Sequence, residues 1–157
     1  MLGQIHLATA IAAMLAGALV VFLRKGTTAH KRAGWVYVAA MVAVNVTAFM
    51  IYDLFGHFGP FHWAALFSLI SVVIGLVPAI TKRPKKRWLQ IHAGWMAGSY
   101  VGLLAAAVAE SATRFLDFPF GATVAIASAA VIIIGVFMII RLTPGSIRNM
   151  GKHRSAG

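Results

Sequence analysis

Histidines occur near the ends of the apolar segments, and their positions are suited to metal or haem binding. The 157-residue chain contains six histidines, and five of them lie at these ends. A neutral imidazole is a good ligand for haem iron, zinc or copper. A flat haem b is held from both faces, which requires two histidines at similar depth on different helices. The spacing predicts one such pair from His30 and His92, and a second pair from His6 and His62.

Other side chains could complete a haem site. Met96 or Met41 could replace one axial histidine. Arg114 follows Glu110 by four residues, about one helical turn, and could pair with it or bind haem propionates. The first hypothesis is therefore a small membrane redox protein for electron transfer, in which haem b is bound by His92, His30, His6 and His62, with Arg114 nearby.

A second set of side chains allows a zinc site. Two or three histidines with a carboxylate suit a zinc ion that keeps an open position for water, and hence hydrolysis. The candidates approach one end of the predicted helices: His6, Asp53, His57, His62 and Glu110. No HExxH or similar motif accompanies them. Because the chain contains no cysteine, thiolate zinc sites, iron–sulfur clusters and disulfides are excluded.

The elements that position these residues are long apolar segments. Hydrophobic residues make up 61% of the chain and charged residues 11%, against roughly 45–50% and about 25% in soluble domains. A helix needs about 20 mostly apolar residues to cross a bilayer core. The sequence predicts an all-α bundle of five transmembrane helices over residues 2–23, 33–54, 61–80, 88–112 and 121–140. Residues 1–142 would form this domain, followed by a basic cytoplasmic tail over 143–157.

The placement of the charges predicts the orientation of the bundle. Of fourteen lysines and arginines, thirteen fall within residues 24–32, 82–87 and 141–154. All three carboxylates, Asp53, Glu110 and Asp117, lie toward the other ends of the spans. Because basic loops stay in the cytoplasm, the N-terminus is expected outside and the C-terminus inside. This placement favours contacts with membrane lipids and argues against nucleic acid, despite a net charge of +11.

Several motifs resemble a known bacterial family. They are HKRAGWVYV at residues 30–38, the stretch 45–52, FGPFH at 58–62 and the stretch 99–110. The resemblance covers roughly residues 3–140 and is to predicted membrane proteins with domain of unknown function 2306. It implies a multi-pass protein of the bacterial inner membrane, with no activity attached. The paired histidines are also similar in architecture to those of four-helix b-type membrane cytochromes.

The short loops leave a further hypothesis open. With no soluble domain predicted, the chain could be a non-enzymatic accessory or assembly subunit of a larger membrane complex, or a homo-oligomer. The sequence identifies neither a redox partner nor a substrate.

Overall fold

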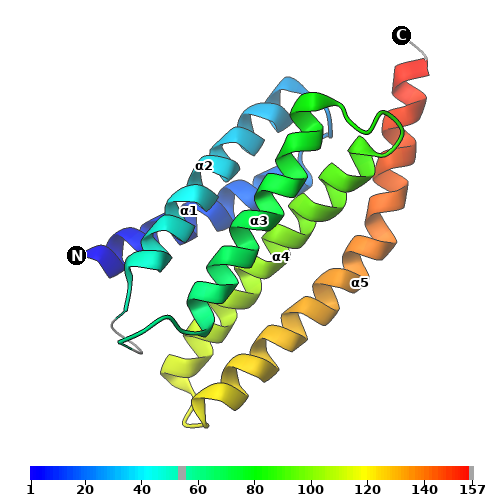
Figure 1. The fold of residues 1–157 in the computed structure, drawn as a ribbon. Helices are drawn as coiled ribbons and strands as arrows, with labels where there is room; N and C mark the ends of the chain where they lie inside the picture. The colour runs from blue at the N-terminus through cyan, green and yellow to red at the C-terminus, as the bar shows by residue number, and fades with distance from the viewer. Residues whose placement is uncertain (53–55, 156–157) are drawn as a thin grey trace.

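A computed structural model describes residues 1–52 and 56–155 of the chain, with side chains described as far as Arg141 (Figure 1). The described residues form helices joined by loops and turns. In chain order the helices are α1 (Leu2–Phe22), α2 (Thr28–Met50), α3 (Pro60–Thr81), α4 (Trp88–Phe115) and α5 (Phe120–Ser155). Each contains a stretch long and apolar enough to cross a membrane. The predicted all-α architecture of five spanning helices is confirmed.

The start of α2 differs from its predicted position. The helix begins at Thr28, five residues before the predicted start at Ala33, and Thr27 caps it by accepting a hydrogen bond from the His30 backbone N–H at 3.2 Å. A threonine side chain satisfies one of the free N–H groups of a first helical turn, so the helix starts within the basic segment. The predicted end at Leu54 lies outside the described residues.

The last helix also extends beyond its predicted end. The predicted span finishes at Ile140, whereas the α5 backbone remains helical to Ser155. Pro144 lies within this helix, although an interior proline removes one backbone hydrogen bond and crowds the carbonyl four residues earlier. The part of α5 that can cross a membrane is Phe120–Arg141. The division into a domain of 1–142 and a tail of 143–157 stays a prediction.

Four of the helices form a ring. α1 packs against α2 and α4, and α3 packs against the same two helices. Therefore α1 lies across the ring from α3, and α2 lies across from α4. α5 packs along α4 outside this ring of helices (Figure 1). The aromatic side chains of Phe61 on α3 and Phe120 on α5 also meet edge to face.

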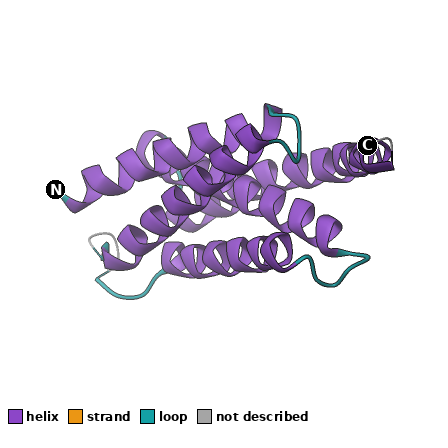
Figure 2. Ribbon diagram, turned by 90° about the horizontal axis from the view of Figure 1, so that it is seen from above, coloured by secondary structure: helices purple, strands orange, loops and turns teal. Residues whose placement is uncertain are grey.

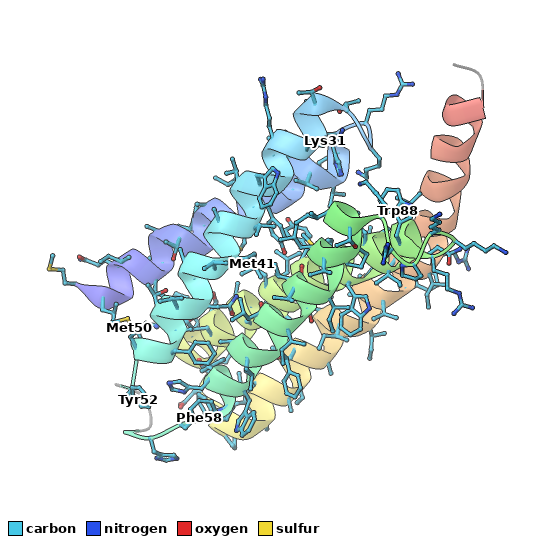
Figure 3. All side chains as sticks on the ribbon, turned by 45° about the horizontal axis from the view of Figure 1, so that its top comes forward. Lys31, Met41, Met50, Tyr52, Phe58 and Trp88 are labelled. Atoms are coloured by element: carbon cyan, nitrogen blue, oxygen red, sulfur yellow. The ribbon has the colours of Figure 1, made fainter. Side chains whose placement is uncertain are left out.

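The connections gather at two ends of the bundle (Figure 2). Loops 23–27 and 82–87 lie at one end, which we call the basic end because nine of the fourteen lysines and arginines fall in residues 24–32 and 82–87. The turns before α3 and before α5 lie at the other end, called here the opposite end. In Figure 3, Lys31 and Trp88 lie at the basic end, Tyr52 and Phe58 lie at the opposite end, and Met41 lies between them.

The ring is held by close packing around two tyrosines. Tyr37 is 2% exposed and meets Tyr100 edge to face, with ring centroids 6.2 Å apart. The Tyr100 hydroxyl donates to the Met14 carbonyl at 3.2 Å and so ties α4 to α1. Gly17 lies beneath these rings. Small residues allow helices to approach closely in lipid, where packing supplies much of the association energy.

A methyl group at Gly17 should disrupt this contact. Added to Gly17, it would overlap two ring carbons of Tyr100 and come within 3.1 Å of Tyr37. The Tyr100 ring cannot easily retreat because its hydroxyl is bonded to Met14. We expect Gly17→Ala to cost about 1–3 kcal/mol of stability, measured by denaturation in detergent. Gly102→Ala is the matched control, because a methyl group there meets nothing within 4 Å. Equal stability of both variants would contradict the contact.

Candidate functional site

The structure places the paired histidines on helices that face each other across the ring. His30 of α2 and His92 of α4 lie toward the basic end, each within the first turns of its helix. His6 of α1 and His62 of α3 lie toward the opposite end. Both predicted pairs therefore join helices that are diagonal in the ring, one pair at each end.

A hydrogen bond across the α3–α4 interface orients His92. Its Nδ1 lies 2.9 Å from the Gly75 carbonyl oxygen. Because a carbonyl only accepts, Nδ1 carries the proton and Nε2 keeps its lone pair. Metal-binding histidines are commonly held in this way, with the second ring nitrogen donating to a carbonyl or carboxylate. Met96, one turn further along α4, packs directly against Gly75.

His6 is oriented by a neighbouring helix in a similar way. Its Nδ1 lies 2.9 Å from the Thr47 hydroxyl oxygen. That hydroxyl is also 2.9 Å from the carbonyl oxygens of Ala43 and Val44, to which it can only donate. A hydroxyl has one proton, so this arrangement favours His6 Nδ1 as the donor to Thr47. The Nε2 atom of His6 then keeps its lone pair.

His62 has the reverse proton arrangement. It is 3% exposed and lies between the rings of Tyr52 and Phe58, at centroid distances of 4.6 and 4.8 Å. The Gly59 backbone N–H donates to its Nδ1 at 3.1 Å and caps α3. A neutral His62 therefore carries its proton on Nε2. While this capping bond holds, Nε2 has no lone pair for a metal.

Two buried atoms lack hydrogen-bond partners among the described side chains, namely His30 Nδ1 and His62 Nε2. One comes from each predicted pair. An unsatisfied buried polar group costs about 1–3 kcal/mol, and such groups in a folded protein call for a specific explanation. At the basic end the unpartnered atom belongs to His30, whereas at the opposite end it is the protonated Nε2 of His62, which lacks an acceptor.

A hydrogen-bond chain lies next to the His30–His92 pair. The Tyr37 hydroxyl and Ser99 Oγ are 2.9 Å apart, and Ser99 donates to the Met96 carbonyl at 2.8 Å. Sequence reasoning missed this α2–α4 contact. A signal was present, since Tyr37 and Ser99 each follow a paired histidine by seven residues, about two helical turns.

The loop between α1 and α2 contributes a lysine that the sequence reasoning also missed. The Lys25 ammonium group donates to the carbonyls of Val20, Val21 and Leu23, and so satisfies the C-terminal end of α1. Burial lowers the pKa of Lys25 from its ordinary value. Its donors are directed at α1, so Lys25 stabilises the helix end beside His30.

The proposed zinc ligands are dispersed where the structure describes them. Glu110 pairs with Arg114 at 2.6 Å, and the two side chains are 42% and 69% exposed. His57 is exposed in the turn before α3. Within the described part of the chain, no three His, Cys, Asp or Glu side chains lie close enough together to hold a metal ion. Asp53 lies outside the described residues, so the zinc site stays a prediction.

Comparison with known families identifies the chain. A family model described as Predicted membrane protein (DUF2306) matches residues 3–153. The chain belongs to this family. The match in this DUF2306 protein includes all four paired histidines and confirms the resemblance seen in its sequence motifs. No curated protein and no solved structure matches the chain.

Proposed function

We propose that this protein is a membrane redox protein that holds one haem b between α2 and α4 through His30 and His92. The observation that carries the proposal is the state of the two imidazoles. His92 presents an Nε2 lone pair, fixed by the Gly75 carbonyl, and His30 has a buried nitrogen with no partner. When bound, haem b supplies one-electron chemistry at its iron.

The surroundings of the pair suit a haem. About two turns further into the bundle, the buried Tyr37–Ser99 hydrogen bond joins the same two helices, α2 and α4. The lysines and arginines at the basic end provide positive charge near the membrane surface, where haem propionates would lie. Met96 remains the candidate to replace one axial histidine, because it follows His92 by one turn.

The second pair is less suited to iron in the described arrangement. His6 presents a lone pair, but His62 accepts the Gly59 N–H and keeps its proton on Nε2. Binding iron at His62 would require the loss of that capping bond. We therefore propose one haem per chain, at the His30–His92 pair.

The proposal also fixes a direction across the membrane. Because basic loops stay in the cytoplasm, we place the basic end, and with it the haem, at the cytoplasmic side of a bacterial inner membrane. The alternative of an accessory or assembly subunit stays a prediction. A stable partner that co-purifies with a haem-free chain would favour it.

Haem content tests the proposal directly. The chain is expressed with haem supplied and purified in mild detergent, and its absorbance and its haem-to-protein ratio are measured. We expect a Soret band, a reducible haem spectrum and one haem b per chain. A colourless preparation that is well folded would overturn the proposal. Two haems per chain would show that the opposite end also binds iron.

A further inference from the structure

A hollow of about 410 Å³ lies on α4 at the basic end, lined by Arg87, Gln90, Ile91, Gly94 and Trp95. The other four residues follow Arg87 by three, four, seven and eight positions, so all five lie along one face of the helix. His92 and Met96 project from the other side of α4, toward Gly75 of α3. The hollow therefore opens away from the histidine pair and does not belong to the proposed haem site.

Gly94 contributes to this hollow because it has no side chain. Among the side chains that the structure describes, none lies within 4 Å of a methyl group placed on Gly94. Val101, on the same stripe, packs closely against Gly135 of α5. The hollow thus continues the α4–α5 interface toward the basic end. Arg87 and Trp95 are eight residues apart, so it extends about 12 Å along the helix axis.

The lining changes from polar to apolar along that length. Arg87 and Gln90 lie at the start of α4, at the level of the basic loop, and Ile91, Gly94 and Trp95 lie further into the span. A guanidinium group binds phosphate oxygens through paired hydrogen bonds. The apolar part is at the depth of lipid chains. This order follows that of a phospholipid, whose phosphate lies at the surface above its hydrocarbon chains.

The charge of the region selects an anionic lipid. Loop 82–87 carries five lysines and arginines and no carboxylate. The described carboxylates Glu110 and Asp117 lie at the opposite end, near the end of α4 and in the turn before α5. Basic segments next to a membrane attract anionic headgroups. The net attraction at this end therefore favours a negatively charged headgroup over a zwitterionic one.

We infer that this hollow is a binding site for an anionic phospholipid. The phosphate contacts Arg87 and Gln90, and an acyl chain lies over Gly94 against Trp95. The inference is independent of haem binding.

Two variants test the site by different physical routes. The full chain is released from nanodiscs of equal phosphatidylglycerol and phosphatidylcholine, and its bound lipid is counted by native mass spectrometry. Arg87→Gln removes the phosphate contact, and Gly94→Leu fills the hollow without changing charge. We expect each to reduce retained phosphatidylglycerol by about fivefold. Added inorganic phosphate is expected not to displace the lipid, because the acyl chain contributes to binding.

Matched controls separate a site from general attraction. Lys86→Gln removes the same charge from a neighbouring exposed residue that does not line the hollow. Gly34→Leu adds the same side chain at an open glycine of α2. Both controls should retain phosphatidylglycerol as the unaltered chain does. Equal retention of the two lipids, or an equal loss in Lys86→Gln and Arg87→Gln, would overturn the inference. So would displacement by phosphate alone, or by a co-purifying protein.

Discussion

Replacing His92 by alanine is expected to abolish haem binding, so that the purified variant shows no Soret band. His92 supplies the imidazole whose Nε2 lone pair is fixed by a hydrogen bond to Gly75. The substitution removes the ligand. No other histidine of α4 can take its place, because His92 is the one histidine in this helix. The measurement is the haem-to-protein ratio of the variant after expression with haem. Circular dichroism and gel filtration confirm that the helices remain folded.

His6→Ala is the matched control for this experiment. It removes an imidazole from the opposite end of the ring, where we propose that no haem is held. We expect the His6 variant to keep its haem with an unchanged spectrum. Loss of haem from His6→Ala, with retention in His92→Ala, would show that the ligand pair was assigned to the wrong end. Addition of free imidazole to His92→Ala should partly restore the spectrum.

The largest effect on stability is expected from Tyr37→Ala. Tyr37 is 2% exposed, packs edge to face on Tyr100 and shares a hydrogen bond with Ser99. Truncating a buried aromatic side chain leaves a cavity and typically costs about 3–5 kcal/mol. The midpoint of thermal or chemical denaturation in detergent should fall accordingly.

Tyr37→Phe separates the ring from its hydroxyl. It keeps the contact with Tyr100 and removes the bond to Ser99, which still donates to the Met96 carbonyl. Interhelical hydrogen bonds in membranes average well below 2 kcal/mol, so we expect a loss of about 1 kcal/mol. If the two variants are equally unstable, the hydrogen bond rather than the ring packing stabilises this part of the core.

The sequence contained most of the information on the fold, since each predicted span corresponds to one helix. Apolar length alone specifies a membrane helix because lipid offers no partner for an exposed backbone. The ends were harder to predict. α2 starts at Thr28 because a single hydroxyl, that of Thr27, caps it, and this local effect lies within a segment that its charge marked as a loop.

The sequence predicted at which end of the bundle each histidine lies, but not which of its ring nitrogens carries the proton. Residue spacing places His30 and His92 at one end and His6 and His62 at the other. Which ring nitrogen carries the proton depends on the carbonyl or N–H that each imidazole meets. Those partners, Gly75 for His92 and Thr47 for His6, come from other helices. The residue pattern of a single helix cannot predict these partners.

The position of α5 has a consequence for biosynthesis. Because α5 packs along α4 outside the ring, every contact that closes the ring is made by residues that leave the ribosome before it. Helices α1 to α4 can therefore make all of their contacts with one another before α5 is inserted into the membrane. The final segment can join them from the surrounding lipid without reopening what has been assembled.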